Sequence, residues 1–251
     1  MKHFKNFKTC VYCTAQTLAS LDEATLARDY AYLEKYVGID KVYLETYRDG
    51  TWVAIDHMKM IQNFFKKHGV EIAGGITTVT PPLEKDDVKR QRLFQTFCYS
   101  NEAMRTCLKK IVTYTAELFD EIILDDFFFT SCTCDDCLRE RSNLSWAEFR
   151  SKKMIDVAEN LVLKPAKLAN PSVKVTIKYP NWRESYHETG YVPKIQPSMF
   201  DKIYTGTETR NTAHTDQHLP RYLSYSIMRY MEHVAPGRNG GGWFDTYSCW
   251  P

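Results

Sequence analysis

The sequence lacks any run of 18 consecutive apolar residues, so no transmembrane helix is predicted. It also lacks an excess of either charge. Its 33 basic and 31 acidic residues leave a net charge of +2, which gives no strong attraction to nucleic acid or to an anionic membrane. The first ten residues, MKHFKNFKTC, are basic but have no apolar stretch like that of a signal peptide. Two locations stay open: cytoplasmic, or secreted or periplasmic if a leader has been removed.

Several motifs are also missing. Neither H-E-x-x-H nor the deaminase pattern H-x-E…P-C-x-x-C occurs, and the seven histidines are scattered, which argues against a metal-dependent hydrolase of these types. No G-x-G-x-x-G and no P-loop follow the first predicted strand, which argues against an open nucleotide-binding sheet.

Short strand-like segments alternate with longer helical ones along the chain. The predicted strands are 7–13, 40–47, 70–77, 120–127, 173–179, 201–208 and 240–247. The predicted helices are 22–37, 54–68, about 85–118, 145–169 and 217–234, with a capping box at Ser145.

Repeated strand–helix units predict an α/β fold with a parallel sheet, and their number favours a (β/α)₈ TIM-type barrel over an open doubly wound sheet. A length of 251 residues suits one barrel domain, 1–251. Only seven strands are found, so the eighth is expected to be missing or truncated, and the chain is expected to be a fragment of a longer protein.

Alternation along each strand predicts which side chains point into the barrel. Lys178 is predicted to point inward, and so are Asp125 and Glu208 at the ends of the fourth and sixth strands. The other inward residues predicted are Tyr43, Glu45, Tyr47, Ile123, Tyr204 and Gly206. Polar side chains therefore gather at the carboxyl ends of the strands, where barrel enzymes have their active sites.

Four acids end the second, fourth, sixth and seventh predicted strands: Glu45, Asp125, Glu208 and Asp245. Two carboxyl groups facing each other across a barrel mouth are what glycoside hydrolysis requires, one as general acid and one as nucleophile or base. Alternatively, these acids are helix caps, ion pairs or solvated strand ends.

Roles are predicted for three of the acidic residues. Lys178 on the neighbouring strand should lower the pKa of Asp125 and keep it ionised. Glu208 has no obvious fixed partner except Arg210, so Glu208 is predicted to be the proton donor. Asp126 becomes the key acid instead if the fourth strand is bulged.

The segments IILDDFFFTSCTCDDC, SWAEFR, KYPNW, YTGTETR and GGWFD resemble uncharacterised bacterial glycoside-hydrolase-like TIM barrels. They are also distantly similar to the α-galactosidase clan. That resemblance implies Asp125 as nucleophile, Asp126 in the position of an Asn, and Glu208 as proton donor. The chain differs from the clan in using Glu on the sixth strand.

Three thiols lie within six residues at Cys132, Cys134 and Cys137, a spacing suited to a tetrahedral zinc ion that needs a fourth ligand. The candidates for that ligand are Cys10, Cys13, Cys249, His187 and His214. The alternatives are a Cys132–Cys137 disulfide, free thiols or a catalytic metal. Cys98 and Cys107 are expected to be packing residues on a helix.

The 34 aromatic residues include Trp182 and Trp243 near the predicted mouth, where a sugar ring could stack on them. The residues expected to contact substrate are Glu45, Lys178, Trp182, Tyr204, Arg210, Trp243 and Asp245. The sequence thus predicts a glycoside hydrolase with a carbohydrate substrate, no nucleic-acid or membrane partner and no cofactor in catalysis. The alternatives are a non-catalytic glycan-binding barrel and a metal-dependent hydrolase that uses the cysteines. A structural zinc site is one of the interpretations that the cysteines leave open.

Overall fold

A computed structural model of the chain describes residues 4–80, 92–208 and 222–244. Its centre is one sheet with strand order β1-β2-β4-β5-β6-β7-β8, in which all neighbouring strands are parallel. The strands are β1 (Cys10–Cys13), β2 (Lys41–Arg48), β4 (Glu71–Ile76), β5 (Glu121–Leu124), β6 (Lys174–Tyr179), β7 (Lys202–Gly206) and β8 (Asn239–Trp243). A two-residue strand that the sequence did not predict, β3 (Thr51–Trp52), pairs antiparallel with the end of β2.

Helices connect the strands. The longer ones are α2 (Glu23–Tyr36), α3 (Ile55–Lys67), α4 (Glu102–Leu118), α6 (Trp146–Val157) and α10 (Leu223–Val234). The shorter ones are α1 (Ala15–Ser20), α5 (Asp135–Arg141), α7 (Lys164–Ala169), α8 (Tyr186–Thr189) and α9 (Gln196–Met199). A π-helix, Ala158–Leu163, joins α6 to α7, and 3₁₀ turns cover Leu93–Gln95 and Arg183–Ser185. Among the described residues, no helix is both long enough and apolar enough to cross a membrane.

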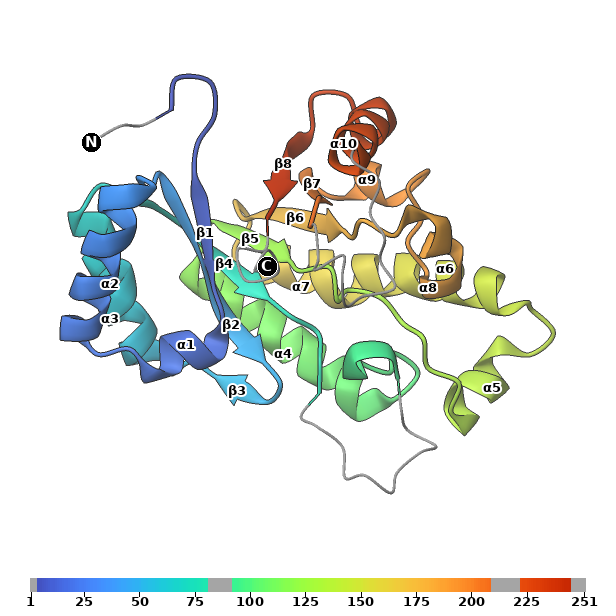
Figure 1. Ribbon diagram of the computed structural model, residues 1–251. Helices are drawn as coiled ribbons and strands as arrows, with labels where there is room; N and C mark the ends of the chain where they lie inside the picture. Colours follow the sequence, from blue (N-terminus) through green and yellow to red (C-terminus); the bar gives the residue numbers. More distant parts are fainter. Residues whose placement is uncertain (1–3, 81–91, 209–221, 245–251) are drawn as a thin grey trace.

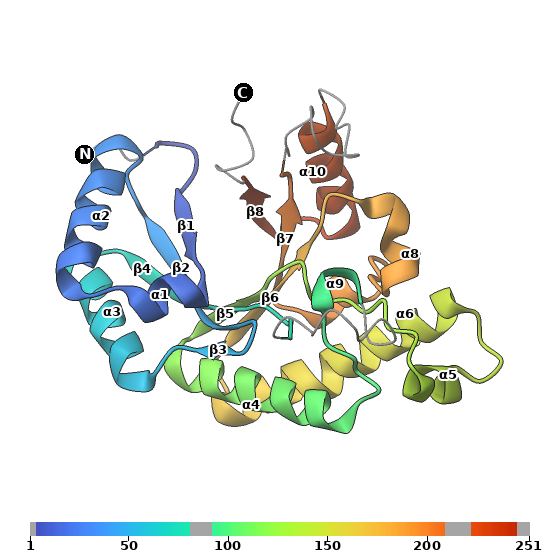
Figure 2. The ribbon, with the colours of Figure 1, turned by 60° about the horizontal axis from the view of Figure 1, so that its bottom comes forward.

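The strands form an arc with the helices outside it (Figures 1 and 2). Figure 2 shows β1 and β8 at the two ends of this arc, and the described residues include no ladder that joins them. This is the predicted TIM-type barrel, and the residues that the structure describes contain seven of its parallel strands and no complete eighth. An open doubly wound sheet would carry helices on both faces, so that alternative is wrong.

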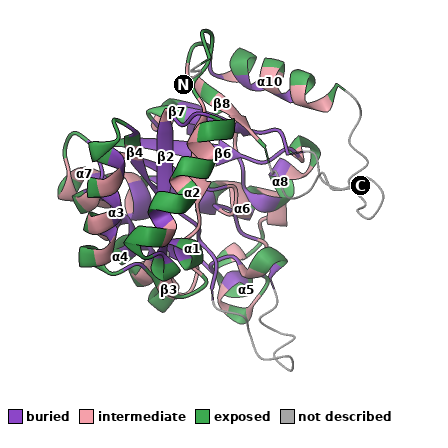
Figure 3. Ribbon diagram, turned by 60° about the vertical axis from the view of Figure 1, so that its left-hand side comes forward, coloured by how far each residue is buried: buried purple, intermediate pink, exposed green. Residues whose placement is uncertain are grey.

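Two apolar clusters lie on opposite faces of the sheet, because successive strand side chains alternate. The larger cluster packs the strands against the helices and includes Val42, Ile122 and Ile203. The smaller cluster fills the inside of the barrel with Tyr43, Ala73, Ile123 and Tyr204. Figure 3 shows β2 and β6 largely buried, while α2 and α10 keep exposed outer faces. The two end strands, β1 and β8, contain no buried residue.

The predicted facing of Tyr47 is wrong. A β-bulge shifts the pairing of β2 with β4 between Glu45 and Tyr47. The extra residue turns Tyr47 to the helix side, where its ring packs on Trp52 and Phe97. Arg48 therefore points into the barrel instead.

The helix predicted for about 85–118 begins only at Glu102, with Asn101 as its N-cap. Part of that prediction, residues 85–91, lies outside the described residues, and residues 96–101 contain no helix. The capping box at Ser145 is confirmed: Glu148 N donates to Ser145 Oγ at 3.2 Å, and Ser145 N donates to Glu148 Oε2 at 2.9 Å.

Candidate active site

One buried ammonium group links three acids at the carboxyl ends of the strands. Lys178 Nζ lies 2.6 Å from Glu208 Oε1, 3.0 Å from Asp126 Oδ2 and 3.2 Å from Asp125 Oδ1. Lys178 comes from β6, which lies between β5 and β7, so the side chain reaches the acids that follow both neighbours. Burial lowers the pKa of Lys178, but the three carboxylates outweigh it and raise that pKa well above its ordinary value.

Asp125 is held from both sides by cations. Its Oδ2 accepts from Arg48 Nη2 at 3.0 Å, and its Oδ1 accepts from Lys178 and from the backbone N–H of Asp126 at 2.9 Å. Burial alone would raise the pKa of Asp125, but Lys178 and Arg48 hold it below its ordinary value. The expectation that Lys178 lowers this pKa thus agrees with the structure, and Arg48 is a second cause.

Asp126 is in a different electrostatic situation, although it is the next residue. Burial, together with the charges of Asp125 and Glu208, raises its pKa to about 8. The positive charge of Lys178 opposes this rise. The backbone carbonyl of Asp126 accepts from Tyr191 Oη at 2.6 Å, which fixes the start of this loop. This raised pKa favours a protonated Asp126 near neutral pH.

Glu208 was expected to have no obvious fixed partner except Arg210, but it pairs with Lys178. Its ion pair with Lys178 is the shortest of the three. Its backbone carbonyl accepts from Asn181 Nδ2 at 2.8 Å. The absence of a side chain at Gly206 makes room for the carboxyl, since a Cβ there would lie 2.6 Å from Glu208 Oε2.

Arg48 is held by Glu45, a fully buried acid that does not reach the surface of the mouth. Arg48 Nε donates to Glu45 Oε2 at 2.9 Å, and Arg48 Nη2 donates to Thr77 Oγ1 at 2.9 Å. Tyr12 Oη donates to Glu45 Oε1 at 2.6 Å, and the backbone N–H of Ala15 donates to Glu45 Oε2 at 2.7 Å. Glu45 thus positions the guanidinium that faces Asp125.

Sequence reasoning missed Arg48, Tyr12 and Thr77. Strict alternation along β2 turns Arg48 away from the barrel, and only the bulge brings it inward. Thr77 follows β4 and lies one step beyond the end of the strand. Its position at a strand end was a usable signal, whereas nothing in the sequence marked the bulge.

One of the aromatic residues predicted at the mouth, Trp243, does lie there. The Trp243 ring centroid is 4.0 Å from Lys178 Nζ, a cation–π contact. Its ring also packs edge-on against Tyr204 and Tyr12. Trp182 instead packs among Phe129, Tyr186 and Tyr191, next to the cluster between sheet and helices.

The pattern of one protein family matches residues 1–250 of the chain, and that family is described as "Probable glycosyl hydrolase, catalytic domain". The chain belongs to this glycosyl hydrolase family. The predicted resemblance to glycoside-hydrolase-like barrels is therefore confirmed.

This glycosyl hydrolase domain has a relative in Saccharolobus solfataricus, an uncharacterised protein that is 32% identical over 267 residues. The match covers 97% of the chain and 43% of the relative, so the chain spans less than half of that protein's length.

Two solved structures share the fold of this glycosyl hydrolase domain. The PgaB (BpsB) glycoside hydrolase domain from Bordetella bronchiseptica has a TM-score of 0.62 at 12% identity, covering 93% of this chain and 81% of that chain. A cold-adapted β-galactosidase from Rahnella sp. R3 has a TM-score of 0.60 at 12% identity, covering 85% of this chain and 41% of its own. At this identity the likeness concerns the barrel alone.

The remaining predicted residues of the glycosyl hydrolase domain fall into two groups. Arg210, His214, Asp245 and Cys249 lie outside the described residues. The three clustered thiols, Cys132, Cys134 and Cys137, lie together, but the side chain that joins them is Cys98. In the described part of the chain, none of the fourth ligands predicted above belongs to that group.

Proposed function

We propose that the chain hydrolyses a glycosidic bond, with Asp126 as the proton donor and Glu208 as the nucleophile. The observation that supports this most is the group of three carboxyls around Lys178 at the mouth of a glycosyl hydrolase barrel. These roles differ from those predicted from the sequence, which gave the proton donor to Glu208 and the nucleophile to Asp125.

Asp126 is the better donor for two reasons. Its raised pKa of about 8 supports a protonated carboxyl near neutral pH. Its side chain is also the most exposed of the three acids, at 13% against 6% for Asp125 and 3% for Glu208. Between the two adjacent aspartates, the greater exposure favours Asp126 as the group that reaches the leaving oxygen.

Asp125 is better suited to position other groups than to react. Lys178, Arg48 and a backbone N–H already occupy its two oxygens. A carboxylate with this many partners loses nucleophilicity, because attack on the sugar would cost it those bonds. We assign Asp125 to hold Arg48 and Lys178 in place beneath the two reacting acids.

The spacing favours a double displacement with retention. Asp126 Oδ2 and Glu208 Oε1 both lie within 3.0 Å of Lys178 Nζ, so these two oxygens are at most about 6 Å apart. Retaining enzymes place their carboxyls about 5–5.5 Å apart, and inverting enzymes about 6.5–9.5 Å apart. In this mechanism Glu208 attacks the anomeric carbon while Asp126 protonates the departing oxygen. Asp126 then removes a proton from the water that releases the sugar.

The sugar is expected at the aromatic side of the mouth. Trp243 presents its ring beside Lys178, and sugar C–H faces stack on such rings. Catalysis by two carboxyls needs no cofactor.

The test is hydrolysis of a panel of aryl α- and β-glycosides by the wild type and by Asp125→Asn, Asp126→Asn and Glu208→Gln. Asp29→Asn on the exposed side of α2 is the control. Asp126→Asn should lower kcat about 10²- to 10⁴-fold on glycosides with poor leaving groups. The loss should be much smaller on those with good leaving groups, which need little protonation. Proton NMR of the first product should show the substrate's anomeric configuration.

Several outcomes would contradict the proposal. Full activity in Glu208→Gln would show that Glu208 is not the nucleophile. A product of inverted configuration would show that the second carboxylate activates a water molecule instead of attacking the sugar. If Asp126→Asn lowered kcat equally for all leaving groups, Asp126 would not be the proton donor. Binding of glycans by a folded wild type that turns over no glycoside would support the non-catalytic alternative.

A further inference from the structure

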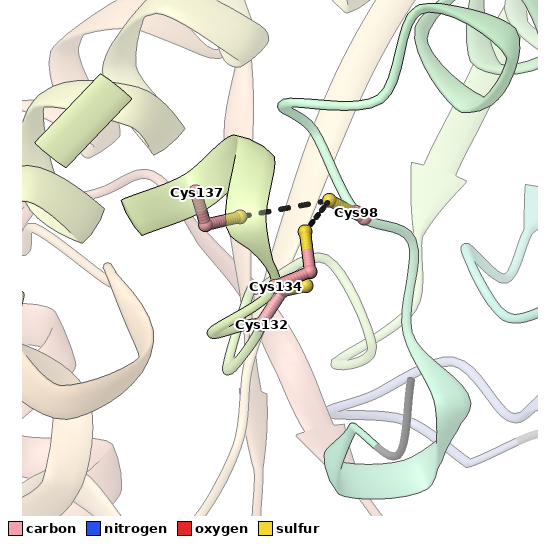
Figure 4. A group of neighbouring side chains, drawn as sticks. All are labelled: Cys98, Cys132, Cys134 and Cys137. Carbon is pink, nitrogen blue, oxygen red and sulfur yellow. Dashed lines mark hydrogen bonds between the residues drawn. The ribbon is translucent and has the colours of Figure 1, made fainter. Parts of the chain in front are cut away.

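Four cysteines from two separate loops bring their sulfur atoms together beside the barrel mouth. Cys132 lies in the loop after β5, Cys134 is the N-cap of α5, and Cys137 lies in the first turn of that helix. Cys98 comes from the segment before α4, 36 residues ahead of Cys134. All four Sγ atoms lie within 4.8 Å of one another (Figure 4).

The distances between these sulfurs fit a shared metal ion. Tetrahedral zinc with Zn–S bonds of about 2.3 Å holds its sulfur ligands about 3.8 Å apart. Cys98 Sγ lies 3.7 Å from Cys134 Sγ and 3.6 Å from Cys137 Sγ. A disulfide requires about 2.05 Å between sulfurs, and all four cysteines are free thiols.

We propose that Cys98, Cys132, Cys134 and Cys137 bind one zinc ion as a closed, structural site. Four thiolates fill every position of a tetrahedral ion and leave none for water or substrate. Soft thiolate ligands in this geometry are also those that zinc prefers. The role is therefore to fix the two loops, and the proposal is independent of the function proposed above.

The surroundings suit a buried metal–thiolate centre. Cys98, Cys132 and Cys137 pack with Phe149, and Met104, Leu144 and Trp146 close over them. Such an apolar shell shields the thiolates from water and strengthens their attraction to the ion.

Two features beside the cluster complete this environment. The guanidinium of Arg150 stacks over Trp146 and donates to the Ser131 carbonyl, one residue before the first thiol. It thus supplies positive charge beside a centre whose net charge is negative. Cys134 is only partly buried and, with Cys98, lines a cavity of about 490 Å³ that gives an ion a route in.

The proposed ion would reinforce bonds that already join these loops. Leu93 N donates to Ser131 Oγ at 2.8 Å, and Ser100 Oγ donates to Glu140 Oε2 at 2.5 Å. The loop that carries three of the thiols starts at the carboxyl end of β5, where Asp126 lies. Removing the ion should therefore make the loop that carries Asp126 less rigid, without removing any group that reacts with substrate.

The first test is the zinc content of protein purified under reducing conditions from zinc-supplied cells. We expect one zinc per chain in the wild type and in Cys107→Ser. Cys107 is a matched control because it lies on α4, packs against the core and is outside the cluster. Cys98→Ser and Cys137→Ser should lose most of the metal, and the melting temperature should fall in these two variants and in chelator-treated wild type. Zinc-free wild type, or full zinc in Cys98→Ser, would overturn the proposal.

A second measurement uses wild type alone, in case the variants fail to fold. Zinc X-ray absorption should show four sulfur neighbours at about 2.3 Å. Cobalt in place of zinc should give the absorption bands of a tetrahedral thiolate complex. Nitrogen or oxygen neighbours, or alkylation mass spectra showing a Cys132–Cys137 disulfide in the purified protein, would overturn it.

Discussion

Lys178 and Glu208 form the shortest of the three ion pairs at the barrel mouth, with 2.6 Å between Nζ and Oε1. Both side chains are at least 97% buried, so neither charge can be solvated if the other is removed. Lys178 also contacts Asp125, Asp126 and the Trp243 ring. This one side chain therefore sets the charge balance of the whole site.

Replacing Lys178 by Met should destabilise the protein by about 3–5 kcal/mol, because it leaves buried carboxylates without their cation. Lys174→Met is the matched control, since Lys174 lies on the same strand but is exposed. Urea unfolding of the two variants and the wild type measures the difference. Equal stability of both variants would mean that water reaches these acids freely.

The pH dependence of kcat/KM should follow Asp126. Its pKa is raised to about 8 and it must be protonated to donate, so activity should fall as pH rises through about 8. The pH profile of the wild type on a glycoside with a poor leaving group measures this limb. The fall in kcat/KM near pH 8 should be absent from the residual activity of Asp126→Asn. If the fall persisted in that variant, it would belong to the titration of another group.

Asp126→Asn should also stabilise the protein, but only at higher pH. A folded pKa raised above the ordinary value means that the folded state keeps a proton that the unfolded state has lost, so stability declines between about pH 4 and pH 8. Asparagine cannot ionise and avoids that decline. We expect a gain of roughly 1–3 kcal/mol at pH 9 and little gain at pH 4. Urea midpoints at the two pH values measure it, and a gain of equal size at both would contradict the raised pKa.

Substituting the two tryptophans should have different effects, on stability for Trp182 and on substrate binding for Trp243. Trp182→Ala removes a ring packed against Phe129, Tyr186 and Tyr191 and should cost about 3 kcal/mol of stability. Trp243→Ala should chiefly raise KM, by about tenfold, through loss of sugar stacking. Thermal melts and Michaelis–Menten kinetics of both variants separate the effects. An unchanged KM in Trp243→Ala would place the sugar elsewhere.

The sequence by itself determined the barrel and the residues that share its mouth. Side chains along a strand alternate strictly, and the carboxyl ends of parallel strands meet at one rim. Those two facts suffice to bring Lys178, Asp125 and Glu208 together, because they lie on three successive strands of the sheet. They also suffice to place Tyr204 inside the barrel.

Only the tertiary structure decided the rest. The bulge that turns Arg48 inward and Tyr47 outward depends on how β2 pairs with β4, and no local pattern encodes that register. Cys98 joins the other thiols because two loops distant in sequence pack against each other. The raised pKa of Asp126 depends on burial and on Asp125, Glu208 and Lys178 together. Each of these properties depends on distances between residues far apart in the chain, which become defined only when the chain has folded.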